Sequence, residues 1–193
     1  MPPYEEFIAR EFDKAALARK EWILQGRPRL FKVDTPAIKN PSRREAKLIV
    51  SAMAQRTTGR FDVVTGQLSV GVHEARDYLD LLDRNGKVRV LIEPNANAIE
   101  ASGRLVRDGF KLIDSALVRL QERIGKGLDV WVLPRPISVH FAVADGFMYR
   151  IETDHDRCEA IAIAGDPDGA ANLDSRFADL LRRSRPLETP MAA

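Results

Sequence analysis

Cysteine is almost absent from this sequence, since Cys158 is the only one among 193 residues. A single cysteine excludes an intramolecular disulfide framework and is typical of a reducing cytoplasm. No apolar run approaches the roughly 18 residues of a membrane helix. The first ten residues contain Glu5 and Glu6 and no apolar core, so they do not resemble a secretory signal. These absences predict a soluble cytoplasmic protein that does not cross a membrane.

The motifs of several common chemistries are also missing. There is no Gly-x-x-x-x-Gly-Lys phosphate loop, no Gly-x-Gly-x-x-Gly after a strand and no Gly-x-Ser-x-Gly elbow. His155 has Asp154, Asp156, Cys158 and Glu159 nearby, but the two-residue Cys/His spacing of a zinc site is absent. We therefore interpret this segment as a solvated loop and expect neither a metal site nor a cofactor.

The charge of the chain is distributed unevenly. Residues 1–60 hold 13 Lys and Arg against 7 Asp and Glu, a net charge of +6, whereas residues 61–193 hold 17 against 21, a net charge of −4. A basic amino-terminal third indicates an anionic partner, either nucleic acid or a partner protein, or else a solvated arm with no partner.

Hydrophobic periodicity predicts an α/β protein with a mixed β-sheet covered by helices. Helices are expected at residues 4–24, 42–55, 74–84, 98–124 and 170–183, and Ser42 and Glu45 have the spacing of a capping box. Strands are expected at residues 61–65, 87–93, 128–133, 138–144, 147–153 and 159–164, with a short edge strand within 27–41. Residues 1–57 form a helical, basic extension in this interpretation, residues 58–185 the α/β domain and residues 186–193 a flexible tail.

The order of these elements resembles a single domain of the phospholipase D-like family over residues 61–185. The matching pieces are FDVVTG, KVRVLIE, RLVRDGFKLIDSALVRLQ, LDVWVLP and SVHFAVADGFMYRIE. The last piece resembles the family's His-x-Lys-x4-Asp strand, which ends in an Asp-Gly turn. Asp145 and Gly146 match that turn, His140 takes the place of the lysine and Ser138 that of the histidine.

The resemblance implies that a histidine attacks phosphorus and that a lysine stabilises the phosphoryl oxygens. Ser138 cannot form a phosphohistidine, and His140 is a weaker partner for a phosphate than lysine. A shift of two residues along a strand would move His140 by roughly 6–7 Å, too far for a positioned nucleophile. The resemblance therefore implies a degenerate, non-catalytic member. A chain with one motif also implies a homodimer, in which His140 either lines a shared cleft or is packed into a dimer core.

Two sets of basic residues are candidates for contact with phosphates. The candidate nucleic-acid-binding cluster consists of Arg27, Arg29, Lys32, Lys39, Arg43, Arg44 and Lys47. A second stripe consists of Arg104, Arg107, Lys111, Arg119, Arg123 and Lys126, but acidic residues interrupt it and such charge runs are usually solvated faces. Trp22 and Phe31 either stack on bases or pack in the core.

Three functions remain open at this point. The favoured one is a homodimeric, non-catalytic binding module that engages nucleic acid or another anionic partner through its basic amino-terminal region. The second is an active phosphodiesterase or nuclease that uses His140 and Asp145 in an altered site. The third is a protein-interaction subunit in which the apolar face of residues 4–24 docks on a partner.

Overall fold

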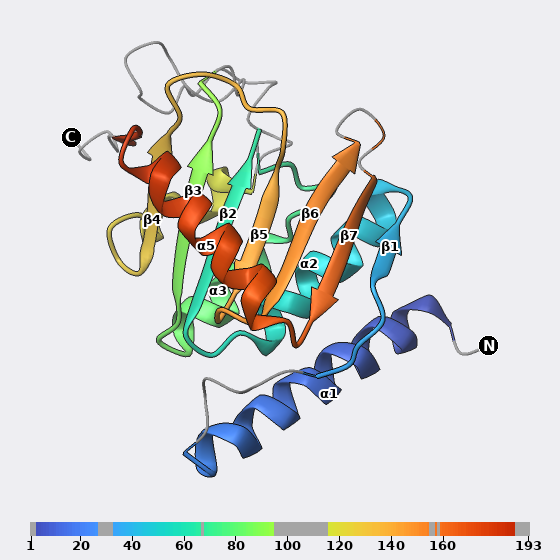
Figure 1. Cartoon of the computed structure of the whole chain (residues 1–193). Helices are drawn as coiled ribbons and strands as arrows, with labels where there is room; N and C mark the ends of the chain where they lie inside the picture. The colour runs from blue at the N-terminus through green and yellow to red at the C-terminus, as the bar shows by residue number, and fades with distance from the viewer. Residues whose placement is uncertain are drawn as a thin grey trace.

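The computed structural model of the chain describes residues 3–26, 33–66, 68–94, 116–154, 157 and 159–187. These residues form an eight-stranded sheet with helices on both faces (Figure 1). The strands are β1 (Ile38–Asn40), β2 (Arg60–Thr65), β3 (Lys87–Ile92), β4 (Leu128–Val132), β5 (Phe141–Ala144), β6 (Met148–Asp154), β7 (Glu159–Ala164) and β8 (Arg185–Pro186). The helices are α1 (Tyr4–Leu24), α2 (Arg43–Arg56), α3 (Ala75–Asp83), α4 (Leu117–Leu120) and α5 (Pro167–Leu181), with a 3-10 turn at Gln121–Arg123. The predicted α/β class with a mixed sheet and a preceding amino-terminal helix is confirmed.

The strand order in the sheet is β1-β7-β6-β5-β2-β3-β4-β8. The strands β2, β3 and β4 run parallel, whereas the other neighbouring pairs are antiparallel. The strands β2, β3 and β6 therefore end at one edge, called here the upper edge after its place in Figure 1. The strand β5 begins at the upper edge and ends at the opposite, lower edge.

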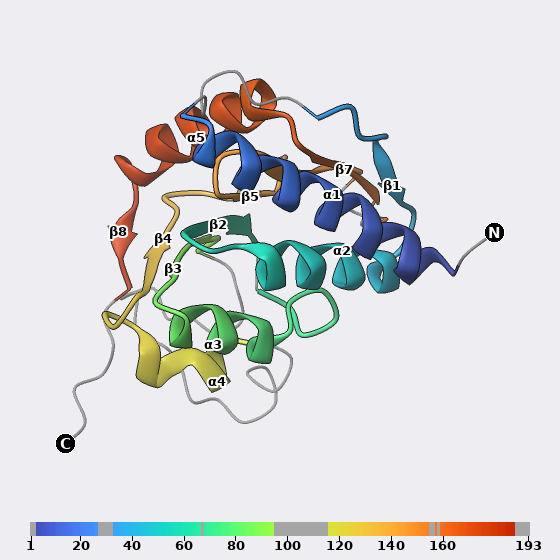
Figure 2. The same cartoon turned by 90° about the horizontal axis from the view of Figure 1, so that it is seen from below.

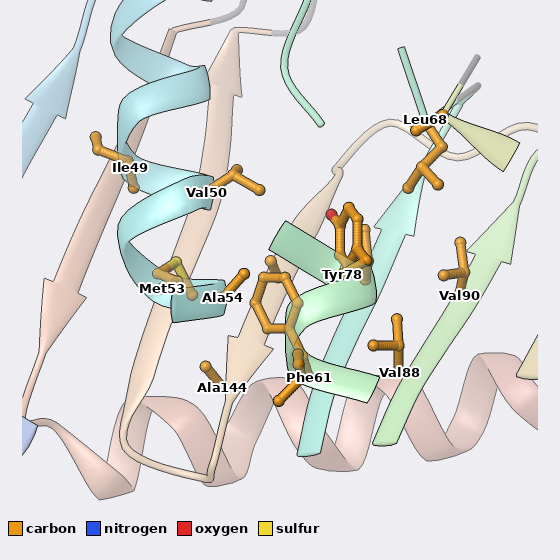
Figure 3. Packing of buried hydrophobic residues seen from close by; sticks show 14 of the residues in the cluster. Ile49, Val50, Met53, Ala54, Phe61, Leu68, Tyr78, Val88, Val90 and Ala144 are labelled. Carbon is orange, nitrogen blue, oxygen red and sulfur yellow. The ribbon is translucent and has the colours of Figure 1, made fainter. Parts of the chain in front are cut away.

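Alternation of side chains along the strands builds a core on each face of the sheet. On one face, Phe61 and Val63 pack with residues of α2 and α3, and the rings of Phe61 and Tyr78 stack with centroids 5.8 Å apart (Figure 3). On the other face, Val64 packs beneath α5 together with Phe177. Both faces of the central strands are thus buried, so functional side chains lie at the strand ends.

The helix α1 packs against α2 along its side, as seen from below the sheet (Figure 2). Ile8, Phe12 and Ala15 recur at four- and three-residue spacing and are buried, which explains why this segment is helical and how it docks. They belong to the same buried cluster as the strands of the sheet. The predicted extension of residues 1–57 therefore contributes α1, β1 and α2 to the common core.

Several predicted boundaries need correction. The strand β5 begins at Phe141, so Ser138 and His140 precede it. The helix α5 begins at Pro167 rather than at the predicted residue 170. The Asp166 side chain caps this end by accepting a hydrogen bond from the Gly169 N–H at 3.2 Å. Ser42 does precede α2, but its hydroxyl donates to the Glu45 carboxylate and makes no side-chain cap to a backbone N–H.

Of the predicted flexible tail at residues 186–193, only Pro186 and Leu187 lie within the described residues. Pro186 lies in β8 opposite Trp131, and Leu187 is buried and donates its N–H to the Val130 carbonyl at 2.8 Å. Of the long helix predicted at residues 98–124, the part up to residue 115 lies outside the described residues. The described end forms α4 and the 3-10 turn. Among the helices described, none combines the length and the apolar character that a membrane crossing requires.

Candidate functional site

The three residues at the motif positions do not gather in one place. Ser138 is exposed in the loop before β5, and His140 lies directly before that strand at the upper edge with only 4% of its surface exposed. Asp145 follows β5 at the lower edge. Five residues of extended chain span roughly 16 Å, so His140 and Asp145 do not contact one ligand group together.

His140 lies between two carboxylates. Its Nε2 is 2.9 Å from Glu93 Oε1, and its Nδ1 is 3.1 Å from Glu152 Oε2. Burial by itself lowers the pKa of His140, but the hydrogen bonds with Glu152 and Glu93 outweigh it, so this pKa is raised above the ordinary 6.5. In the protonated ring both nitrogens donate, which satisfies one oxygen of each carboxylate.

Glu93 reaches His140 across the end of an intervening strand. Glu93 follows β3 and also accepts the Ile137 N–H at 2.9 Å. Gly66 follows β2, which lies between β3 and β5. A Cβ on Gly66 would lie 3.5 Å from both Glu93 Oε2 and His140 Cε1. This distance is ordinary van der Waals contact, so residue 66 lies directly beside the pair formed by Glu93 and His140.

The polar network continues from Glu152 in β6 toward the edge strand β1. Arg150 donates from NH1 to Glu152 Oε1 at 3.2 Å and from Nε to Asn40 Oδ1 at 3.1 Å. We call Glu93, His140, Glu152, Arg150 and Asn40 the upper-edge network. It joins the end of β3, the start of β5, and the strands β6 and β1, so it holds together segments that are distant in sequence.

A second buried histidine lies near the upper-edge network. His73 Nδ1 is 2.5 Å from the Tyr78 hydroxyl. Burial, together with the positive charge of Arg150, lowers the pKa of His73 to about 3, and burial raises the pKa of Tyr78. His73 is therefore buried and neutral at ordinary pH.

Asp145 has a different set of contacts, all at the lower edge. One carboxylate oxygen accepts the backbone N–H of Gly59 at 2.9 Å and of Arg60 at 2.8 Å, and the other accepts that of Thr58 at 2.9 Å. Arg19 of α1 donates to the latter oxygen at 3.3 Å. Asp145 therefore ties the turn after β5 to the start of β2 and to α1, which is a structural task.

Four residues of the candidate nucleic-acid-binding cluster lie in the described part of the chain. Lys39 in β1 is exposed, as are Arg43 and Arg44 in the first turn of α2. Neither Arg43 nor Arg44 has an ion pair within the described residues, whereas Lys47 pairs with Glu74 at 2.5 Å. Arg27, Arg29 and Lys32 lie outside the described residues.

The other sequence-based candidates are less informative. Arg123 of the interrupted basic stripe pairs with Asp83, Arg119 and Lys126 are exposed, and the remaining members lie outside the described residues. Trp22 packs partly buried against the core cluster, and Phe31 is not described. In the part of the chain that is described, no three His, Cys, Asp or Glu side chains gather in a way that suits a metal ion. His155, Asp156 and Cys158 lie outside it.

Sequence reasoning missed Glu93, Glu152, Arg150 and Asn40. A two-residue turn at Asp145-Gly146 would pair Ala144 with Phe147 and therefore His140 with Ile151. The observed loop holds one residue more, so Ala144 pairs with Met148 and Phe141 with Ile151, and the next pair outward is His140 and Glu152, whose N–H donates to the His140 carbonyl at 2.9 Å. Glu93 had no signal either, because its contact depends on the order of strands in the sheet.

Comparison with known proteins supports the fold. No family model matches the sequence, and no curated protein matches it. The solved structure of TrmBL2, an archaeal chromatin protein described as having a novel mode of DNA binding, matches with a TM-score of 0.57 and 13% identity. That match covers 94% of this chain and 66% of TrmBL2, slightly less than two thirds of its length.

Two other solved structures match over a shorter part of this chain. Nuc from Salmonella typhimurium, a phospholipase D family member, matches with a TM-score of 0.56 and 10% identity over 78% of this chain and 95% of its own. NucT from Helicobacter pylori matches with a TM-score of 0.56 and 11% identity over 78% and 97%. The chain therefore has the phospholipase D-like fold, as its order of elements predicted.

Proposed function

We propose that this chain is a non-catalytic phospholipase D-like module that binds nucleic acid through its basic amino-terminal region. The observation that carries the proposal is the environment of His140. This residue replaces the family lysine and is held between Glu93 and Glu152, 2.9 and 3.1 Å away. In the family, the residue at this position contacts a phosphate. Here the corresponding side chain, that of His140, contacts two carboxylates of the protein itself.

The charges of the upper-edge network oppose phosphodiester cleavage. A phosphate brought to His140 would meet the carboxylates of Glu93 and Glu152, and the charge on its oxygens would be repelled rather than stabilised. Ser138 has a hydroxyl where the family has its nucleophilic imidazole, and a serine needs an adjacent base to act as a nucleophile. Both ring nitrogens of the neighbouring His140 already face carboxylates.

The basic surface around α2 supports nucleic-acid binding. Lys39, Arg43 and Arg44 are exposed near one another in the sequence, and the two arginines stand in the first turn of α2. Exposed N–H groups and the positive end of a helix dipole at such a terminus add to the attraction of the arginines for phosphate. The likeness in fold to an archaeal DNA-binding chromatin protein is consistent with this assignment.

The proposal includes a homodimer. The resemblance in sequence order implies two copies whose motif segments meet, since each chain carries one segment. An isologous contact of this kind would bring the two His140 neighbourhoods together across a twofold axis.

Charge reversal at Arg43 and Arg44 tests the binding site. We expect the Arg43→Glu/Arg44→Glu variant to bind labelled duplex DNA at least about tenfold more weakly than the wild type, because two phosphate contacts become repulsive. The plot of log K against log salt concentration has a negative slope, and the magnitude of this slope should decrease by roughly 2. Fluorescence anisotropy over a salt series, with single-stranded DNA and RNA in parallel, measures both quantities.

The matched control is Arg182→Glu/Arg183→Glu. It changes the net charge by the same amount but lies at the end of α5, on the opposite face of the sheet from α2 (Figure 1). Its affinity should remain close to that of the wild type. Equal weakening by the two double variants would contradict a binding site at α2, and so would a wild type that binds none of the nucleic acids.

Absence of cleavage is the second expected result. We expect wild type and His140→Ala to leave single- and double-stranded DNA, RNA and a chromogenic phosphodiester intact over a long time course, with or without a chelator. The physical reason is the missing nucleophile at Ser138 and the negative charge around His140. Cleavage by the wild type that His140→Ala loses would overturn the non-catalytic assignment.

A further inference from the structure

An open groove lies beside α1 at the lower edge of the sheet, which is the opposite edge from the upper-edge network. It has a volume of about 940 Å³ and is bounded by the outer part of α1, the end of α2 and the turn at Asp145. Its residues on α1 extend from Arg10 to Leu24, a length of about 21 Å, or roughly four helical turns. The groove is therefore long enough to seat a helical segment.

Exposed aliphatic side chains line this groove. Leu17 is 59% exposed, Ile23 51% and Leu24 78%, and they are the large hydrophobic residues found exposed in the described part of the chain. At 3.6 residues per turn, Leu17 and Leu24 lie on the side of α1 opposite to the buried Ile8, Phe12 and Ala15, whereas Ile23 lies nearer the direction of Phe12, about three turns farther along the helix. A cluster of exposed aliphatic residues on one helix marks an interaction surface more often than solitary ones do.

The charges around the groove are mainly positive. The basic residues that line it are Arg10, Lys14, Arg19, Lys20 and Arg56, and the acidic ones are Asp13 and Asp145. Both acids are already paired, Asp13 with Arg56 at 2.7 Å and Asp145 with Arg19 at 3.3 Å. Arg10 pairs with Glu11, whereas Lys20 has no ion pair within the described residues. The groove thus presents an apolar stripe bordered by positive charge.

This combination distinguishes between possible occupants. A second copy of α1 docked in the groove would bring Lys14, Arg19 and Lys20 close to cations of the same kind. Nucleic acid would gain from the cations, but its bases stack on aromatic rings rather than on leucine and isoleucine. A segment with acidic and aliphatic residues on one helical face would satisfy both the charge and the apolar stripe.

We propose that the groove binds an acidic, amphipathic helix of a partner protein, whose aliphatic side chains contact Leu17, Ile23 and Leu24. This site is separate from the proposed nucleic-acid surface. Arg56 borders the groove at one end of α2 and Arg43 stands at the other, so the two surfaces are about 20 Å apart along that helix. The inference does not depend on the function proposed for Arg43 and Arg44.

A labelled synthetic peptide tests the proposal on the full chain. The peptide carries leucines at alternating three- and four-residue spacing and glutamates elsewhere, and a scrambled peptide of the same composition is the matched control. We expect the ordered peptide to bind the wild type more tightly than the scrambled one in an anisotropy titration. Leu17→Ser/Leu24→Ser and, separately, Lys20→Glu should each weaken binding at least about tenfold. Arg43→Glu/Arg44→Glu should change it less than about twofold, since those arginines lie at the far end of α2.

Other outcomes overturn the proposal. Equal binding of the ordered and scrambled peptides would show charge attraction without a groove. Unchanged affinity in Leu17→Ser/Leu24→Ser would place the peptide elsewhere. Light scattering of the wild type and of the same double variant tests the second copy, because loss of a dimer only in the variant would assign the groove to self-association. These substitutions are at exposed positions, and circular dichroism confirms that each variant is folded.

Discussion

Asp145→Ala is expected to lower the free energy of unfolding by about 3 kcal/mol or more. The carboxylate is 3% exposed and accepts the N–H groups of Thr58, Gly59 and Arg60 as well as a hydrogen bond from Arg19. Its removal leaves three backbone donors without their partner and releases one attachment of α1. Urea unfolding, followed by the fluorescence of Trp22 and Trp131, measures the loss.

Two further variants separate the carboxylate from the backbone at this turn. The φ angle of Asp145 is 52°, in the left-handed region that alanine disfavours and that glycine and asparagine tolerate. Asp145→Gly should therefore lose the hydrogen bonds without backbone strain, and Asp145→Asn should retain one accepting oxygen and lose about half as much stability as alanine. A loss below about 1 kcal/mol in all three variants would contradict the anchoring role of this carboxylate.

His140→Gln is expected to destabilise the protein in a pH-dependent manner. Near pH 6 we expect a loss of about 2 kcal/mol, because the buried imidazolium donates to both Glu93 and Glu152. Although burial lowers the pKa of His140, the two carboxylates raise it more, so the folded chain holds this proton to a higher pH than the unfolded chain does. The contribution is thus complete below about pH 6.5 and is lost as the pH rises through the raised, folded-state pKa.

The measurement is the difference in unfolding free energy between wild type and His140→Gln from about pH 6 to about pH 9. This difference should decrease as the pH rises. His73 has the opposite pH dependence, because burial lowers its pKa to about 3 and the folded state then resists protonation in acid. It is present in both proteins, so its contribution largely cancels in the difference. A difference that stays constant with pH would contradict a charged His140 between the two carboxylates.

Local patterns predicted much of the fold. The spacing of Ile8, Phe12 and Ala15 is that of a helix with one buried face, and α1 covers the predicted residues. The Asp145-Gly146 pair predicted a hairpin turn, and both residues have positive φ angles, 52° and 70°, but the loop also includes Phe147, because Ala144 pairs with Met148. Where the prediction was wrong, as at the start of β5 and of α5, the boundary depended on capping and pairing that periodicity does not reveal.

By itself, the sequence determined the order of elements and the turn at Asp145-Gly146, and it has Ser138 and His140 where the resemblance leads one to expect a histidine and a lysine. These features depend on residue identity and on neighbours within a few positions or across one tight turn. Only the tertiary structure decided that Glu93, 47 residues from His140, completes the upper-edge network, and that Arg19, 126 residues from Asp145, secures α1. Both contacts depend on strand order and helix placement, which result from packing the whole chain. The same packing leaves Leu17 and Leu24 facing outward, although their residue type alone would place them in the core.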